Sequence, residues 1–214
     1  MCGIVGYIGK YDTTKILLDG LKELEYRGYD SAGIAVLHGN EIDVFKAVGK
    51  LVNLEEKVNQ NNKDRYNLGI GHTRWATHGK PTEVNAHPHL GEYSYVVHNG
   101  IIENYKELKD ELTSLGHNFV SQTDTEVIVH LFEHYNNKLN DAKKAFQETI
   151  KRLAGAYAIL LITKKDPEKI FFYKLGSPMI VGHGIEKDEV LFASSDSALI
   201  GLANDVVYLD DKIG

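Results

Sequence analysis

The chain has 214 residues and a formal net charge of −6, with 43% hydrophobic and 25% charged residues. This balance is typical of a globular protein with a sizeable core, arranged as one large domain or two small ones. The negative charge disfavours binding to nucleic-acid phosphates, and the single cysteine, Cys2, excludes an internal disulfide and favours a reducing compartment. The N-terminal residues show no signal-peptide pattern and no apolar run is long enough to span a bilayer, so we expect a cytoplasmic protein.

Strand-like apolar runs dominate the chain. Ten of them occur, at residues 2–8, 31–37, 41–48, 68–74, 93–99, 156–162, 169–175, 179–183, 189–195 and 205–209. The short connection LHGNE predicts a hairpin between the second and the third run. The glycine-rich stretches GYIGK and GHG match neither a P-loop nor a dinucleotide fingerprint, which argues against nucleotide binding.

Helical patterns separate these runs. We expect helices over 14–26, over 104–115, from 124 or 125 onward, and over 142–153. Asp12 or Thr13 is available to cap the first of them. Strands joined by hairpins, with helices in two groups, predict an α+β fold with antiparallel sheet rather than a parallel βαβ sheet.

The only thiol lies at the second position, in MCGIVGYIG. If Met1 is removed, Cys2 carries both a thiol and a free α-amine. The amine has an ordinary pKa of about 7.7 to 8.0 and can accept the thiol proton, so nucleophile and base come in one residue. The alternatives are a small, buried and inert cysteine, or a site of lipid attachment that lacks an accompanying signal.

The polar segment GHTRWATHGKPTEVNAHPH contains the end of a predicted strand, at Arg74 and Trp75. An arginine at a strand end is well placed to bind a carboxylate with two hydrogen bonds, although a solvated arginine beside a core tryptophan is the plainer interpretation. Four histidines of this segment invite a zinc site, but their spacing fits no common zinc signature. These four are His72, His78, His87 and His89.

Two further segments supply an amide and a carboxylate. Asn99-Gly100 follows the strand YSYVVH; the pair is a common hairpin turn, yet a helical pattern rather than a returning strand comes next. The Asn99 amide and the Gly100 backbone N–H are the two donors that an oxyanion hole needs. In SQTDTEV, Asp124 is either a helix cap or a partner for a ligand ammonium. Arg74 and Asp124 together would describe a site for an α-amino acid.

The segments MCGIVGYIG, EYRGYDSAGIA, GHTRWATHG with NAHPH, VVHNGIIENY and SQTDTEV resemble those of class II glutamine amidotransferases, in order and over essentially the whole chain. The resemblance is greatest to the glutaminase domains of glutamine–fructose-6-phosphate aminotransferases. It implies an Ntn-hydrolase fold, a four-layer αββα sandwich of two stacked antiparallel sheets between helical layers. It also implies hydrolysis of L-glutamine to glutamate and ammonia without a metal or organic cofactor.

The resemblance assigns a role to each motif residue. Cys2 would be the nucleophile and its α-amine the base, with Asn99 and Gly100 as the oxyanion hole. Arg74 would bind the α-carboxylate of glutamine and Asp124 its α-amine. The remaining residues would line or close the pocket or orient the N-terminus: Trp75, Thr77, His78, Arg27 and Gly28.

The resemblance also bears on what surrounds the domain. The family continues into a linker and two C-terminal sugar-isomerase domains, so we expect residues 1–214 to be a single glutaminase domain that delivers ammonia to fructose 6-phosphate. A homodimer is left open for the full-length enzyme. With Met1 retained, Cys2 would have no free amine. The alternatives are a glutamine-binding module without chemistry and a different acceptor for the ammonia.

Overall fold

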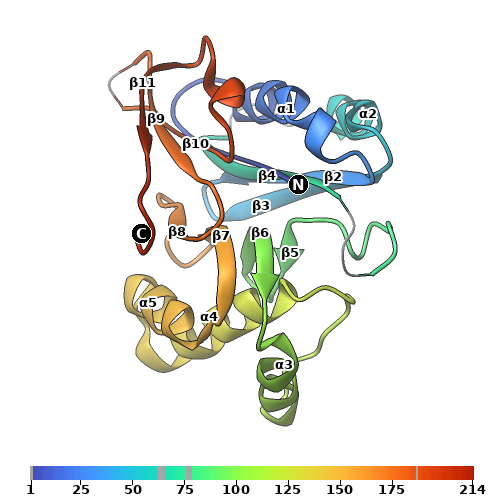
Figure 1. Ribbon diagram of the computed structural model, residues 1–214, viewed down its shortest axis with the longest axis vertical. Coiled ribbons are helices and arrows are strands. Elements are labelled where there is room, and N and C mark those ends of the chain that lie inside the picture. The colour runs from blue at the N-terminus through green and yellow to red at the C-terminus, as the bar shows by residue number, and fades with distance from the viewer. Residues whose placement is uncertain (1, 62–65, 76–78, 187) are drawn as a thin grey trace.

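The chain folds into two antiparallel sheets with helices on their outer faces (Figure 1). The structure, a computed structural model, describes residues 2–61, 66–75, 79–186 and 188–214. The larger sheet has the strand order β11-β9-β10-β1-β4-β2-β3. Its strands are β1 (Gly3–Ile8), β2 (Ser31–His38), β3 (Glu41–Val48), β4 (Leu68–Arg74), β9 (Ile180–Gly184), β10 (Val190–Ala193) and β11 (Ala203–Tyr208).

The smaller sheet has the order β5-β6-β7-β8. Its strands are β5 (His89–Leu90), β6 (Ser94–Ile102), β7 (Gly155–Thr163) and β8 (Phe171–Leu175). The α-helices are α1 (Thr13–Glu23), α2 (Leu51–Asn61), α3 (Tyr105–Ser114), α4 (Glu126–Leu139) and α5 (Ala142–Arg152). Two short 3-10 helices are η1 (Glu25–Arg27) and η2 (Asp196–Leu199).

Alternation along the strands explains the layers. In β1, Ile4 belongs to the core between the two sheets, whereas Val5 faces the core beneath α1 and α2. In β7, Leu160 lies between the sheets and Ile159 packs toward α4 and α5. Because successive side chains of a strand point to opposite faces, sheets that are apolar on both faces build three separate cores. The result is a four-layer sandwich, with α1 and α2 above and α4 and α5 below in Figure 1.

The strand predictions are confirmed, since each of the ten apolar runs contains a strand. The hairpin at LHGNE is also confirmed: β2 and β3 pair from Ser31↔Val48 to His38↔Glu41, and Gly39 in the turn has φ +58°. All strand pairs within the two sheets are antiparallel, as the hairpin-rich pattern predicts.

The helix predictions need two corrections. The first helix ends at Glu23 and is followed by η1, so 14–26 is not one helix; Asp12 caps it by accepting a hydrogen bond from the Lys15 N–H. The sequence reading missed α2 altogether. That helix buries only Leu51, Leu54 and Val58, a sparse pattern among polar residues.

The Asn99-Gly100 pair is not a turn, which corrects the sequence interpretation. Strand β6 continues through both residues to Ile102, and Asn99 pairs with Ala158 of β7. Gly100 has φ +118°, and a Cβ there would lie 2.0 Å from the Ala156 carbonyl oxygen, so the irregularity lies inside the strand and requires glycine. Across the described part of the chain, no helix is long and apolar enough to cross a membrane.

Candidate active site

The candidate site lies where the ends of three strands meet. Gly3 of β1 pairs with Thr73 of β4, so Cys2 lies beside the last residue of β4, Arg74. Strand β6 of the smaller sheet approaches from below, and the Asn99 Nδ2 donates a hydrogen bond to the Cys2 carbonyl oxygen at 3.0 Å. Residues 2, 74 and 99, far apart in the sequence, are therefore neighbours.

The Cys2 thiol is held by the backbone of Trp75. The Trp75 N–H donates to Sγ at 3.1 Å, and the thiol lies 3.5 Å from the Trp75 carbonyl oxygen. Burial raises the pKa of the Cys2 thiol, and the Trp75 N–H and the charge of Arg74 only partly oppose this effect. The resting thiol therefore keeps its proton at neutral pH, and a base is needed to form the thiolate.

A cavity with both signs of charge adjoins the thiol. It is lined by Cys2, Arg74, Trp75, His87, His98, Gly100, Thr123, Asp124 and Thr125. Arg74 is only 3% exposed, and its guanidinium donates to the Gly79 and Lys80 carbonyl oxygens at 3.3 and 3.4 Å. Asp124 is 6% exposed and accepts a hydrogen bond from the Ile102 N–H at 2.8 Å. A guanidinium and a carboxylate in one cavity match the two charged groups of an α-amino acid.

Asp124 does not cap the helix that follows it. The cap residue of α4, Thr125, makes no capping hydrogen bond with its side chain either. Its hydroxyl instead lies 3.0 Å from His87 Nε2 and 3.0 Å from His98 Nδ1. The cap interpretation of this segment is therefore wrong, and its polar side chains turn toward the cavity and the β6 strand.

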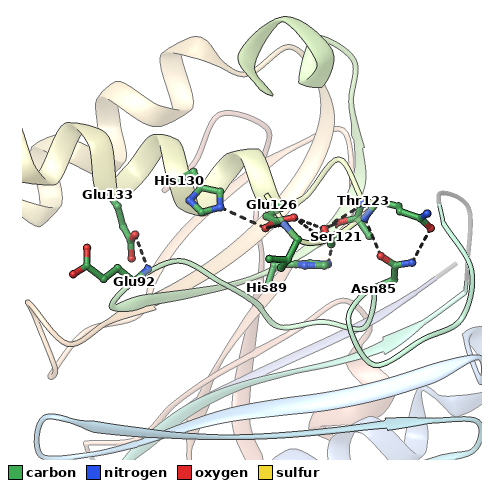
Figure 2. Close-up of polar contacts among 10 residues, drawn as sticks. Asn85, His89, Glu92, Ser121, Thr123, Glu126, His130 and Glu133 are labelled. Atoms are coloured by element: carbon green, nitrogen blue, oxygen red, sulfur yellow. Dashed lines mark hydrogen bonds and ion pairs between the residues drawn. The ribbon is translucent and has the colours of Figure 1, made fainter. Parts of the chain in front are cut away.

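The segment that carries Asp124 is held by buried polar contacts (Figure 2). The Glu126 carboxylate accepts hydrogen bonds from the Val120 N–H and from the N–H and hydroxyl of Ser121, at 2.8, 2.7 and 2.6 Å, and lies 3.4 Å from His130 Nε2. Burial by itself would raise the pKa of Glu126, but these hydrogen bonds outweigh it and lower that pKa to about 2. Glu126 is therefore ionised at neutral pH and fixes the loop ahead of α4.

Two more contacts tie this segment to β5 and to the stretch that precedes it (Figure 2). The Asn85 amide pairs with Gln122, accepting from its N–H at 2.9 Å and donating to its Oε1 at 3.2 Å. The Thr123 hydroxyl lies 3.0 Å from His89 Nε2. Asp124 thus sits in a short loop whose neighbours are bonded on both sides.

A second cavity also adjoins Cys2. It is lined by Cys2, Arg27, Asn99, Gly100, Ile101, Ser177 and Pro178. The Arg27 guanidinium donates to the Ser194 carbonyl oxygen at 3.2 Å. Gly28 packs against the backbone of the Arg74–Trp75 pair, where a Cβ would lie 2.8 Å from the Arg74 carbonyl carbon. Gly28 therefore permits the close approach that positions the backbone next to Cys2.

The structure brings together most residues selected from the sequence. Trp75 lines the first cavity, is 46% exposed, and packs edge-to-face on Tyr29 with 5.5 Å between ring centroids. Thr77 and His78 lie outside the described residues. Sequence reasoning did not select His98, Thr123 or Thr125 as lining residues; their only local signal is that they adjoin Asn99 or Asp124. Within the described ranges, no cluster of three His, Cys, Asp or Glu side chains could hold a metal ion.

Comparison with known proteins identifies the family. The glutamine amidotransferase domain family matches residues 72–201, more than half of the chain. The chain belongs to this family. Curated relatives of this glutamine amidotransferase domain include proteins named glutamine–fructose-6-phosphate aminotransferase [isomerizing]. The one from Campylobacter jejuni is 59% identical over 211 residues and the one from Helicobacter pylori 54% identical over 212. Each match covers 99% of this chain and 35% of the relative, so the chain spans about a third of their length.

Solved structures of related proteins share the fold of this glutamine amidotransferase domain. A glutamine phosphoribosylpyrophosphate amidotransferase from B. subtilis, complexed with ADP and GMP, superposes with a TM-score of 0.81 at 27% identity, over 97% of this chain and 44% of that one. A glutamine aminotransferase class-II domain protein from Silicibacter pomeroyi gives 0.66 at 16% identity, over 98% and 92%, which shows the fold alone. The predicted Ntn-hydrolase sandwich is confirmed by these likenesses and by the four layers.

Proposed function

We propose that this domain hydrolyses L-glutamine to L-glutamate and ammonia, with Cys2 as the nucleophile. The observation that carries the proposal is the shared cavity in which the Cys2 thiol, the Arg74 guanidinium and the Asp124 carboxylate meet. In this proposal Arg74 binds the α-carboxylate with its planar fork and Asp124 binds the α-ammonium. The side-chain amide of glutamine then reaches the thiol. Trp75 adds to the lining of this cavity.

The reaction needs a base because burial raises the pKa of the Cys2 thiol. In a chain that has lost Met1, the α-amine of Cys2 takes the thiol proton, through a water molecule, and the thiolate attacks the amide carbon. The negative charge that develops on the carbonyl oxygen is stabilised by the Asn99 amide and the Gly100 N–H. The C–N bond breaks, and the leaving nitrogen takes the proton from the Cys2 ammonium and departs as ammonia.

A thioester between Cys2 and the glutamyl group results. Water attacks this thioester while the amine accepts one of its protons, and the same oxyanion donors stabilise the second tetrahedral intermediate. The C–S bond then breaks, the proton returns to sulfur, and glutamate leaves. One water is consumed for each amide hydrolysed. Arg27 and Gly28 keep the N-terminal residue in place beside the Arg74–Trp75 backbone.

In a longer protein this domain would supply the ammonia for glucosamine 6-phosphate formation from fructose 6-phosphate. The names of the relatives at 59% and 54% identity support that acceptor, and the remaining two thirds of their length would hold the sugar-isomerase domains. Residues 1–214 then act as one glutaminase domain, and a homodimer is one state open to the full-length protein.

The test is an assay of glutamate release by the purified domain, with loss of Met1 verified by intact mass. We expect hydrolysis that fructose 6-phosphate does not stimulate. Cys2→Ala should lower the rate by at least about a thousandfold while leaving the thermal melt in place, because the nucleophile is lost. A fixed tag ahead of Cys2 should inactivate as well. Full activity in a tagged, unprocessed protein would contradict the amine as base, and glutamine binding without any hydrolysis would support the non-catalytic alternative.

A further inference from the structure

A buried histidine of β4 touches the amide of Asn99. His72 has no exposed surface, and its Nε2 lies 3.1 Å from two oxygen atoms, the carbonyl of His98 and the Oδ1 of Asn99. His72 does not line the cavity around Arg74 and Asp124, so any effect on the reaction must pass through Asn99.

The chemistry of these atoms fixes the protons. A backbone carbonyl only accepts hydrogen bonds, so His72 Nε2 must carry a hydrogen. The Asn99 atom that faces this N–H must then be its oxygen. The Asn99 NH2 is left to point the other way, where it meets the Cys2 carbonyl, which also only accepts, at 3.0 Å. The two ends of the amide therefore agree on one orientation.

The His72 ring is neutral and carries its hydrogen on Nε2, as this orientation of the Asn99 amide requires. Burial lowers the pKa of His72 to about 3, and the contacts with Asn99 and His98 raise it only in part, so the ring is neutral. It stacks on His87, with 3.9 Å between ring centroids and 24° between planes. Among the described residues, His72 Nδ1 has no hydrogen-bond partner, which agrees with a neutral ring protonated at Nε2.

We propose that His72 is the positioning residue of the oxyanion hole: its Nε2–H sets the Asn99 amide so that the NH2 faces the substrate oxygen above Cys2. This inference rests on the proposed glutaminase function. The NH2 has two hydrogens, one bound to the Cys2 carbonyl and one directed to the developing oxyanion. An amide rotated by 180° would present its oxygen to that negative charge and repel it. His72 excludes the rotated state because it would then face an NH2 with its own N–H.

The test compares His72→Leu with His72→Gln in the processed domain. Leucine removes the donor, whereas glutamine places an amide N–H near the position of Nε2. We expect His72→Leu to lower kcat for glutamine hydrolysis by about a hundredfold with KM changed less than about threefold, the signature of a lost oxyanion donor. His72→Gln should recover at least tenfold of that loss. In the Asn99→Ala background, His72→Leu should cause no further loss, because the amide it positions is absent.

Two measurements separate positioning from general damage. Alkylation of Cys2 by iodoacetamide is a displacement that expels iodide and develops no oxyanion, so its rate should stay within about twofold of the unsubstituted domain. As a matched control, His89→Leu removes another buried histidine, one that contacts Thr123 rather than Asn99. It should raise KM more than it lowers kcat.

Three results would overturn the inference: an unchanged kcat in His72→Leu, a kcat loss in the double variant equal to the two single losses combined, or an alkylation rate that falls as much as kcat does. In each case, glutamine hydrolysis by the unsubstituted domain would still support the proposed function. Absence of hydrolysis in that unsubstituted, processed domain would overturn both. The two failures are therefore distinguishable in one series of assays.

Discussion

Two regions place polar side chains in the cavities that adjoin Cys2, and they do so by different means. Asn99 and Gly100 lie within β6, where pairing with β7 on one side fixes the backbone. Asp124 lies in a loop and owes its place to side chains, chiefly the Glu126 carboxylate and the Thr123–His89 contact. The strand region is thus set by register, and the loop region by buried polar groups that must stay bonded. We expect damage in the first region to affect the chemical step and damage in the second to affect binding and stability.

The largest effect expected is in the strand region. Asn99→Ala removes a donor that acts on charge formed only in the transition state, so kcat should fall by roughly a hundredfold to a thousandfold with KM nearly constant. Steady-state glutamate release measures both constants. A raised KM with kcat untouched would mean that Asn99 binds the ground state and is not in the oxyanion hole.

Substitutions at Asp124 in the loop region, and at Arg74 at the end of β4, should instead raise KM and leave kcat nearly constant. Arg74→Lys keeps the charge but loses the planar fork, and Asp124→Asn loses the ammonium partner. Each should raise KM for glutamine by roughly tenfold to a hundredfold, the range for a lost hydrogen bond to a charged group. Glutamine titrations of the two variants are the check. If either change lowered kcat alone, the division between the regions would fail.

The loop region should also be sensitive to pH. A shift of the Glu126 pKa from its usual 4.5 to about 2 corresponds to at most about 3 kcal/mol of the free energy of unfolding. Because the folded-state pKa is lowered, this stabilisation is present above about pH 5 and is lost as pH falls toward 2. Glu126→Gln should lower stability near pH 7 and flatten the profile below pH 5.

Urea unfolding between pH 3 and 7 measures that profile. The matched control is Glu111→Gln, because Glu111 pairs with Arg152 at the surface and such pairs contribute less than about 1 kcal/mol. Parallel profiles for Glu126→Gln and the unsubstituted domain would show that the loop does not depend on this carboxylate.

The smallest effect expected is at Trp75. Its backbone N–H, not its indole, touches the Cys2 sulfur, so Trp75→Ala keeps that hydrogen bond. The exposed side chain packs on Tyr29 and can cover bound glutamine. We expect a loss of only about threefold in kcat/KM for the isolated domain, measured by glutamate release. A hundredfold loss would mean that the indole, rather than the backbone, organises the site.

The sequence predicted the strands of the sheets better than it predicted the contacts between the two sheets. Apolar runs marked every strand of the larger sheet; in β1, β2 and β4 these runs are long because both faces of the strand are buried. Helix α2 escaped because only Leu51, Leu54 and Val58 are buried among polar residues. The Asn99-Gly100 pair has the local signal of a hairpin turn. The continuation of β6 depends instead on pairing with β7, about 55 residues away, which that local signal does not include.

The residues of the candidate site were likewise predictable only where the signal is local in the sequence. Cys2, Arg74, Asn99 and Asp124 were selected because each has a local chemical signal and a family resemblance. The contact between His72 and Asn99 has no such signal, since it arises where β4 of one sheet crosses β6 of the other. A residue of one sheet that positions a residue of the other sheet can be identified only from the three-dimensional structure.

The place of β1 in the larger sheet has a consequence for biosynthesis. Its two neighbours are β4, about 65 residues later, and β10, about 185 residues later. Within this domain, the strand that is synthesised first is therefore among the last to complete its hydrogen bonds, since Ala193 must emerge before Val5 gains its second partner. Until then the strand that follows Cys2 has an unpaired edge, and the sheet around it is complete only after nearly the whole domain has been synthesised.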